Sequence, residues 1–380
     1  MNPSAPKTEV ELKLNAPDPA ALDKLPAALA SLFDRVEPGP PLAIRDLYLD
    51  TDDWRLRRAG FGCRVRLIPG AAILTLKAAG QVQQGWASRL EMEERLDAEP
   101  KLPGPFPGKD LAARFAPALR GVPVKVLVEI RKDQQPYTLF GPGGLKAEAI
   151  ADRVHVLGHG QGARFAEIEI ELIAGDKERF RDLAEKLRKH LGLEGCAGSK
   201  LDRALELAGL KPPSIEDDDA SRLRPSDRVI TAAYRILRKH FARLLWHDPG
   251  ARLGFDPERL HDMRVAARRI LAALRLFRDA LPQRRVETLR REFRWLAGEL
   301  GRVRDLDVSI ARLEAEARDM GPDVEKAVAP YRDSMARDRE RARRRMLRSL
   351  SSRRYEALIT RAERWLKLGP PRRPAAAGSA

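Results

Sequence analysis

The chain of 380 residues has little of several features that define common protein classes. Its two cysteines, Cys63 and Cys196, are too few and too isolated for a disulfide framework or a zinc site, which fits a reducing compartment. No stretch approaches the roughly 18 apolar residues of a membrane span. The first residues, MNPSAPKTEVELKL, have no apolar segment of the signal-peptide type. We therefore expect a cytoplasmic protein with no membrane partner.

Lysine is scarce in the second part of the chain, although that part is strongly basic. Residues 221–380 hold 39 Lys and Arg against 21 Asp and Glu, and only three of the 39 are lysine. Residues 1–220 hold 32 Lys and Arg against 34 Asp and Glu, so the net charge of +16 arises in the second part. Arginine favours planar, bidentate contacts with phosphate oxygens. A GC-rich genome would also favour arginine, but it would not produce the step in charge.

The length suggests two domains. Residues 211–226, KPPSIEDDDASRLRPS, combine proline, serine and an acidic run without periodicity, as a linker does. We expect one domain over 1–210, the linker over 211–226, a second domain over 227–368 and a disordered tail over 369–380. Strand patterns dominate the first domain, with helices near 20–34, 110–119, 176–191 and 200–209. The second domain shows only helical patterns, near 226–246, 256–280, 284–299, 304–319, 323–348 and 353–367.

Five segments of the first domain place charged or hydroxyl side chains at alternate positions, as in Glu9-Val-Glu11-Leu-Lys13 and Glu167-Ile-Glu169-Ile-Glu171. The other three contain Arg64 and Arg66, Thr75 and Lys77, and Arg89, Glu91 and Glu93. Successive side chains of a strand point to opposite faces, so each segment has one apolar face and one polar, mostly charged face. This pattern predicts a closed barrel with a charged interior that binds metal ions and a polyanion. Salt bridges across a solvated sheet are the simpler alternative.

The helices of the second domain carry basic faces. In the helix near 256–280, apolar residues recur every three or four positions, and His261, Arg264, Arg268 and Arg275 fall on the opposite side. Two further faces contain Arg228, Arg235 and Lys239, and Arg337, Arg341, Arg344 and Arg348. Any one of these faces could be an ordinary solvated surface. Three of them in one small domain predict a polyanion-binding surface.

Motifs of the first domain resemble the CYTH, or triphosphate tunnel metalloenzyme, family. Glu9, Glu11 and Lys13 match its ExExK signature, and Leu74-Thr75-Leu76-Lys77 matches its LTLK strand. The other similar segments follow in family order and cover about 7–205: Asp46-Leu-Tyr48-Leu-Asp50-Thr51, Gly62-Cys-Arg64-Val-Arg66, Arg89 with Glu91 and Glu93, Arg131, Glu148, Asp152, the acidic strand from Glu167 to Glu171, and Ser199-Lys200.

The resemblance implies an α+β multidomain protein with an N-terminal eight-stranded antiparallel β-tunnel and flanking helices, followed by an all-α helical bundle. It also implies a triphosphate substrate with Mg²⁺ or Mn²⁺, since phosphoryl transfer needs cations around the phosphates and hard metal ions prefer oxygen ligands. The expected phosphate-binding catalytic cations are Lys13, Arg64, Arg66, Lys77, Arg89, Arg131 and Lys200. The expected metal ligands are Glu9, Glu11, Glu169 and Glu171, with Glu91, Glu93, Glu148, Asp152 and Glu167 as further acids of the lumen.

Two motifs of the second domain resemble the CHAD, or conserved histidine α-helical, domain. They are His261-Asp-Met-Arg264-Val-Ala-Ala-Arg268-Arg269 and Leu300-Gly301-Arg302-Val-Arg304-Asp305-Leu-Asp307. The resemblance implies that inorganic polyphosphate contacts His261, Arg264, Arg268, Arg275 and Arg304, whereas Asp305 and Asp307 orient arginines or cap a helix. The family usually has a second histidine–arginine helix, but the last of the six histidines here is His261. The second binding half is therefore short or degenerate.

The combined reading is a metal-dependent inorganic triphosphatase tethered to a polyphosphate-binding domain, with an association with polyphosphate granules as a hypothesis. A nucleoside triphosphatase or adenylate cyclase of the same fold is the first alternative. A non-enzymatic scaffold that binds polyphosphate or nucleic acid is the second. The helical domain has few residues suited to reading bases, so a plain phosphate polymer is favoured and nucleic acid stays open as a partner.

Overall fold

The computed structural model describes residues 7–79, 82–83, 86–157, 162–214 and 222–370, with the side chains of residues 7–9, 82–83 and 87–89 excepted. Two compact units make up the chain, Met1–Pro212 and Pro213–Ala380, and each is described by itself. Parts of two predicted segments, residues 215–221 of the linker and 371–380 of the tail, lie outside the described residues.

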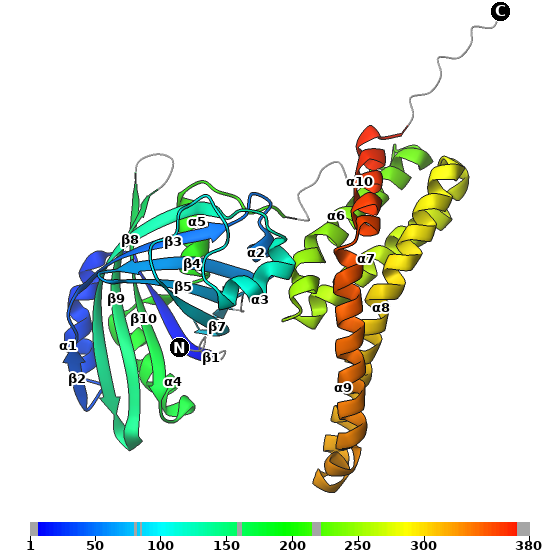
Figure 1. Ribbon diagram of the computed structural model, residues 1–380. Coiled ribbons are helices and arrows are strands. Elements are labelled where there is room, and N and C mark those ends of the chain that lie inside the picture. The colour runs from blue at the N-terminus through cyan, green and yellow to red at the C-terminus, as the bar shows by residue number, and fades with distance from the viewer. Residues whose placement is uncertain (1–6, 80–81, 84–85, 158–161, 215–221, 371–380) are drawn as a thin grey trace, which may run out of the picture. The chain divides into compact units, whose positions relative to one another are not determined.

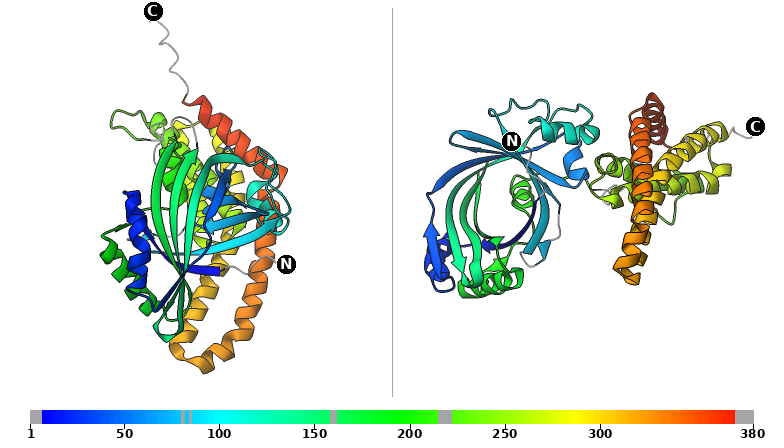
Figure 2. Two further views of the ribbon diagram at one scale, coloured as in Figure 1. Left: turned by 90° about the vertical axis from the view of Figure 1, so that its left-hand side faces the viewer. Right: turned by 60° about the horizontal axis from the view of Figure 1, so that its bottom comes forward.

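Eight strands of the first unit form a closed ring, because β1 pairs with β7 as well as with β10. All neighbours in the ring are antiparallel. In spatial order they are β1 (Lys7–Ala16), β10 (Ala163–Ala174), β9 (Leu145–Leu157), β8 (Lys125–Gly141), β3 (Leu42–Asp50), β4 (Phe61–Ile68), β5 (Ala71–Ala78) and β7 (Trp86–Leu96). Short strands β2 (Arg35–Pro38), β6 (Val82–Gln83) and β11 (Glu194–Gly195) extend β8, β7 and β1. The predicted eight-stranded antiparallel tunnel is confirmed, and Figures 1 and 2 show the sheet curling around its axis.

Helices cover the apolar outer face of the ring on two sides. Leu12 and Leu14 of β1 share a core with Leu29 of α1 (Leu25–Ala30) and Phe180 of α4 (Lys177–Leu191). The 3₁₀ helix η1 (Pro19–Lys24) leads into α1 and contributes Leu22 to the same core. On the other side lie α2 (Arg55–Arg58) and α3 (Asp110–Leu119), where the ring of Phe115 meets that of Phe61 edge to face at 5.1 Å. On these two sides the apolar outer face is covered by helices, which leaves the charged face for the interior.

Helix α5 (Lys200–Leu207) closes the tunnel interior at one end. Its residues Leu201, Ala204 and Leu205 pack against Tyr48, Val128, Ile130, Val154, Val156 and Phe165, which come from β3, β8, β9 and β10. In the right-hand view of Figure 2 a short green helix lies inside the ring of strands. The first residue of this helix, Lys200, is therefore held at the inner face of the sheet.

The second unit is all α-helical, as predicted. Its helices are α6 (Val229–Leu253), α7 (Pro257–Leu276), α8 (Gln283–Met320), α9 (Pro322–Leu350) and α10 (Arg353–Leu368). A core that includes Leu237, Ile270, Leu300, Leu350 and Trp365 joins all five helices.

The prediction of two separate helices at 284–299 and 304–319 is wrong, because α8 runs without a break through Gly298 and Gly301. Glycine weakens a helix but does not end it when neighbouring residues are packed. Here Leu296, Leu300 and Val303 are fully buried on the core side of α8. Packing therefore compensates for the lower helix propensity of the two glycines.

Candidate active site in the tunnel

Lys13 of β1 lies between two carboxylates of the inner face. Its ammonium donates to Glu169 of β10 and lies 3.1 Å from the carboxylate of Glu11. Burial opposes the charge on Lys13, but the carboxylates of Glu169 and Glu11 outweigh it, so the pKa of Lys13 is raised. The alternation Glu11-Leu-Lys13 puts both charged groups inside while Leu12 packs outside.

Lys200 occupies the centre of an acidic cluster. Ser199 and Asp202 form a capping box at the start of α5, which fixes the position of this first turn. The Lys200 ammonium donates to Asp152 and lies 2.7 Å from Glu167 and 3.5 Å from Glu169. Burial disfavours its charge, but the three carboxylates raise its pKa well above the ordinary value. Lys200 is therefore a permanently charged cation inside the tunnel.

Asp46 of β3 organises a second group of cations. Its carboxylate accepts a bidentate pair of hydrogen bonds from Arg66 of β4, at 3.0 and 3.2 Å. Arg64 and Lys132 each approach it at 3.8 Å. Asp46 is fully buried, yet the three cations outweigh the effect of burial and lower its pKa. The carboxylate thus holds three cations close together without being exposed itself.

Lys132 of β8 differs from the other buried lysines. It bridges Asp152, at 3.3 Å, and Asp46. Burial and the nearby Lys200 ammonium lower the pKa of Lys132 to about 7. Its charge therefore changes in the neutral pH range, whereas Lys13 and Lys200 stay protonated.

The tunnel wall is completed by β5 and β7. Lys77 of β5 lies 3.0 Å from Glu91 of β7, and the same carboxylate is 3.9 Å from Arg64. The hydroxyl of Thr75 donates to Glu93 at 3.0 Å. These pairs connect β4, β5 and β7 across the inner face, so acids and cations face one another in this part of the wall.

Carboxylates also lie side by side in the strand register. Glu171 of β10 is directly opposite Glu11 of β1 on one side and Glu148 of β9 on the other. Like charges at such positions destabilise a sheet, and a cation between them removes the repulsion. In the described part of the chain, no three acidic, histidine or cysteine side chains converge tightly enough to enclose a metal ion. Mg²⁺ typically uses one or two carboxylates together with substrate phosphates, and this donor set suits such binding.

The structure brings most of the predicted tunnel residues together on one inner face. They are Glu11, Lys13, Arg64, Arg66, Lys77, Glu91, Glu93, Glu148, Asp152, Glu167, Glu169, Glu171 and Lys200, of which Glu148 and Glu171 are placed by strand register. Glu9 and Arg89 pair through their backbones, but their side chains lie outside the described residues.

The prediction that Arg131 is a tunnel cation is wrong, because this residue lies on the outer face of its strand. Its side chain is 64% exposed and lies against Glu129 on the outer side of β8. The next residue, Lys132, points inward instead and is almost completely buried. Asp46 and Lys132 are site residues that sequence reasoning missed. The sequence signal that could have found Lys132 is its alternation with the polar Gln134 along β8. The structure buries both side chains.

The basic residues predicted in the helical unit have different surroundings. Arg264 of α7 lies 3.0 Å from Asp305 of α8, and Arg304 donates to Glu258 at 2.9 Å. Arg235 contacts Asp227 at 3.0 Å. On the surface lie Arg228, Lys239, Arg268, Arg275, Arg337, Arg341, Arg344 and Arg348, and His261 is half-buried. Asp305 and Asp307 each hold an arginine, as expected, with Arg339 as the partner of Asp307.

Residues 7–205 match the CYTH domain, and residues 235–380 match the CHAD domain. The first match covers more than half of the chain, and the chain therefore belongs to the CYTH family, with a CHAD domain following the tunnel. The CYTH family consists of metal-dependent triphosphate tunnel enzymes.

Two uncharacterized proteins of Mycobacterium tuberculosis, from strains CDC 1551 / Oshkosh and ATCC 25618 / H37Rv, are each 25% identical over 348 residues. The alignment covers 86% of this chain and 64% of each relative, so the chain spans less than two thirds of their length. A Hippeastrum protein described as an adenylyl cyclase with a dominant triphosphatase activity has a TM-score of 0.41 at 22% identity, over 54% of this chain and 98% of its own. A Bacillus halodurans protein described as an adenylate cyclase has a TM-score of 0.37 at 19% identity, over 52% and 97%.

Proposed function

We propose that the tunnel hydrolyses inorganic triphosphate with the help of Mg²⁺ or Mn²⁺. The observation that carries this proposal is the closed ring whose inner face holds buried lysines and arginines paired with carboxylates. Burying a charged side chain is energetically unfavourable unless it is paired with an opposite charge. A site that contains several such buried charges is suited to a highly charged ligand. A triphosphate is such a ligand, because it carries several negative charges on adjacent phosphates.

The cations bind the phosphates by exchanging partners. Without substrate, Lys13 and Lys200 are held by the lumen carboxylates, and Arg64 and Arg66 by Asp46. A bound triphosphate provides new oxygen acceptors for the same cations, which then neutralise the charge that develops in phosphoryl transfer. The cations are fixed in advance by the sheet and by α5, so little reorganisation is required.

The metal would be held by Glu11 and Glu169 together with Glu9 and Glu171. When bound there, a divalent ion would supply Lewis-acid chemistry toward phosphate and water. When Lys13 turns to the substrate, the carboxylates of Glu11 and Glu169 that it now pairs with become available as ligands. Another lumen carboxylate would then orient the attacking water.

The test is phosphate release from triphosphate by the full chain with Mg²⁺ or Mn²⁺. Glu11→Gln removes a metal ligand and Lys77→Ala removes a phosphate-binding cation, and both are expected to abolish the activity. Unchanged rates in both variants would contradict the assignment of the activity to the tunnel. Assays with ATP separate the related enzymes, since a cyclase yields cyclic AMP and pyrophosphate, and a nucleoside triphosphatase yields ADP and phosphate.

For the helical unit we propose binding of inorganic polyphosphate to the basic side chains around α7 and the adjoining part of α8. His261, Arg264, Arg268 and Arg304 are the central residues, and the pairs Arg264–Asp305 and Arg304–Glu258 link the two helices. Such binding would bring the enzyme to polyphosphate granules. Competition between polyphosphate and DNA at fixed salt tests this proposal, because both polymers bind electrostatically and respond to ionic strength.

A further inference from the structure

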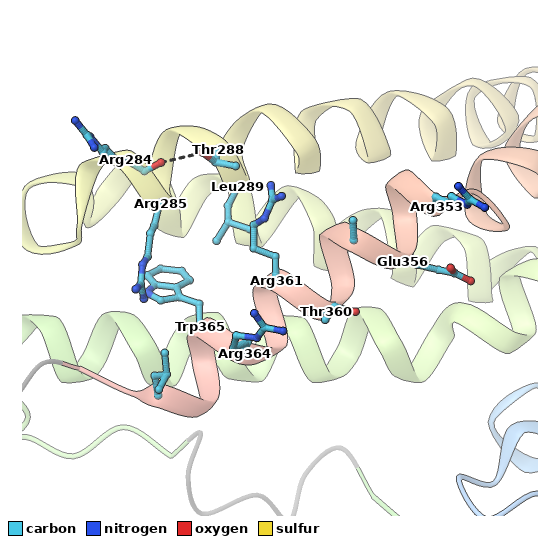
Figure 3. Close-up of a pocket in the computed structure, with 12 residues that line it drawn as sticks. Arg284, Arg285, Thr288, Leu289, Arg353, Glu356, Thr360, Arg361, Arg364 and Trp365 are labelled. Atoms are coloured by element: carbon cyan, nitrogen blue, oxygen red, sulfur yellow. Dashed lines mark hydrogen bonds between the residues drawn. The ribbon is translucent and has the colours of Figure 1, made fainter.

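A groove of about 890 Å³ lies between the beginning of α8 and α10, away from the His261 motif in sequence. Its walls carry five arginines: Arg284 and Arg285 from α8, and Arg353, Arg361 and Arg364 from α10. We call these five residues and the space between them the arginine groove. Glu356 is the one acidic residue in its lining. In Figure 3 Arg361 reaches into the space between the helices, Arg285 lies beside Trp365, and Arg284 points away at the rim.

The arrangement follows from packing within the unit. Tyr355, Leu358, Ala362 and Trp365 of α10 turn toward the core, where Trp365 contacts Tyr234 of α6 at 5.1 Å between ring centres. Arg353, Arg361 and Arg364 lie on the flank of the same helix, at spacings of eight and three residues. The first turns of α8 face this flank. The groove is therefore built on two helices anchored in the core.

In the part of the chain that the structure describes, the arginines of the groove are not paired with carboxylates, whereas other arginines of this unit are. Within the described residues, none of the five arginines has a carboxylate within 4.0 Å. Neighbouring arginines do have such partners, since Arg290 lies 3.0 Å from Glu287 and Arg354 lies 2.7 Å from Glu292. Five positive charges facing one acidic residue repel one another, and an anionic ligand would relieve this repulsion.

The lining also indicates what kind of anion fits. Arg353 and Arg364 are eleven residues apart on α10, which corresponds to ~16 Å along the helix. A single phosphate cannot contact arginines spread over that length, whereas a chain of phosphates can. The lining contains no Asn or Gln, and Trp365 is only 4% exposed, so it provides neither amide contacts to adenine nor an aromatic ring for base stacking.

We propose that the arginine groove is a second binding site for inorganic polyphosphate, separate from the His261 motif. Guanidinium groups from two facing helices bind successive phosphates of an extended chain. The proposal rests on the proposed polyphosphate binding of the helical unit and adds a site to it. Longer chains are expected to bind more tightly than triphosphate at this site, because they contact more arginines at once.

The test uses the full chain and polyphosphate of defined length, with affinity measured by calorimetry at several salt concentrations. The groove variant is Arg285→Ala with Arg361→Ala and Arg364→Ala. The matched control is Arg312→Ala with Arg318→Ala and Arg332→Ala, three arginines of α8 and α9 outside the groove, of which Arg332 is half-buried and the other two are exposed. We expect the groove variant to bind polyphosphate at least tenfold more weakly than wild type. Its affinity should also depend less steeply on salt concentration, by a slope that corresponds to about two to three fewer released counterions. The control variant should bind within twofold of wild type.

Equal losses in both triple variants would overturn the groove site, because net charge alone would then explain them. Normal binding by the groove variant, together with a loss in His261→Ala with Arg264→Ala, would also overturn it while leaving the proposed function intact. No polyphosphate binding by the wild-type chain would remove both binding proposals, and phosphate release from triphosphate would still test the tunnel. Preferred binding of single-stranded DNA at the groove would contradict the choice of ligand.

Discussion

Adjacent side chains of one strand can have unrelated roles, as Arg131 and Lys132 show. Arg131 is exposed on the outer side of β8 with Glu129, and Lys132 is buried between Asp46 and Asp152 inside the tunnel. Both are cations in a strand-forming segment, so composition does not separate them. The difference arises from the period of two along the strand.

The first prediction compares the same substitution on the two faces of β8. Lys132→Met keeps the length of the side chain but removes a buried cation of the proposed active site, and should lower kcat/KM for triphosphate by about 10- to 100-fold. Arg131→Met should leave kcat/KM within about twofold. Steady-state phosphate release measures both, and the melting temperature checks that each variant is folded. A larger loss in Arg131→Met would contradict the assignment of faces.

The second prediction concerns pH. Lys132 has a pKa lowered to about 7, so in the free enzyme it loses its charge as the pH rises through 7. The profile of kcat/KM reports the free enzyme and should descend near pH 7, since we expect only the charged form of Lys132 to attract phosphate. Lys132→Met should lack this descending limb over pH 6–8 and keep a lower, flat activity. A limb that persists in the variant would assign the titration to another group.

The same pKa has a consequence for stability. A lysine with an ordinary pKa of 10.5 when unfolded and about 7 when folded binds more protons in the unfolded state between these values. Its contribution to stability is therefore least below pH 7 and increases as the pH rises from 7 to 10.5. Urea denaturation at pH 7 and pH 9 measures the free energy of unfolding, and its increase between these pH values should be smaller in Lys132→Met than in the wild type.

Single side chains also decide where helices end. The C-terminal end of α6 is capped by Arg343 of α9, which donates to the carbonyls of Arg252 at 2.7 Å and Leu253 at 2.9 Å. The helix then ends at Gly254, whose φ of 73° is left-handed. An added Cβ at this glycine would come within 2.3 Å of the Arg343 guanidinium. The backbone conformation therefore favours glycine at this position, and a larger residue would also displace the Arg343 guanidinium from the cap.

The third prediction tests this contact between elements. Arg343→Ala leaves the last carbonyls of α6 without their side-chain donor and should lower the free energy of unfolding by about 1–3 kcal/mol. Its neighbour Arg344 is exposed, with Glu340 no nearer than 3.8 Å, so Arg344→Ala should change stability by less than about 0.5 kcal/mol. Urea denaturation followed by circular dichroism measures both. Similar values for the two variants would show that the cap is unimportant.

At the scale of the whole molecule, the two compact units have separate hydrophobic cores. The helical core contains Leu300 and Trp365, and the cores of the tunnel unit contain residues such as Leu14 and Phe165. None of the described helices combines the length and the hydropathy that a membrane span requires. Multidomain chains with separate cores commonly unfold in more than one step.

The fourth prediction follows from this division. Leu300→Ala removes a fully buried side chain from the helical core and should cost about 2–5 kcal/mol there. Calorimetry should show two thermal transitions in the wild type, with only one of them shifted to lower temperature in the variant. Triphosphate hydrolysis at 25 °C should be unaffected. A single transition that shifts as a whole would mean that the units unfold together.

Much of the tunnel could be predicted from local pattern. Charged residues at alternate positions, as in Glu167, Glu169 and Glu171, reveal a strand with one charged face without any knowledge of its neighbours. The predicted helices of the second unit are also close to those observed, apart from α8 and from α6, which continues to Leu253 instead of ending near 246. Its continuity through Gly298 and Gly301 depends on buried contacts of other residues, which local propensity does not contain.

By itself, the sequence determined the type of each element, the charged faces and the basic character of the helical unit, because these depend on the spacing of residues a few positions apart. Only the tertiary structure decided that β1 closes on β7, that Lys132 rather than Arg131 enters the tunnel, and that arginines of α8 and α10 face each other. These features depend on pairing and packing between segments far apart in the chain. The alternation along β8 puts Arg131 and Lys132 on opposite faces, but only the closed ring decides which face is inside.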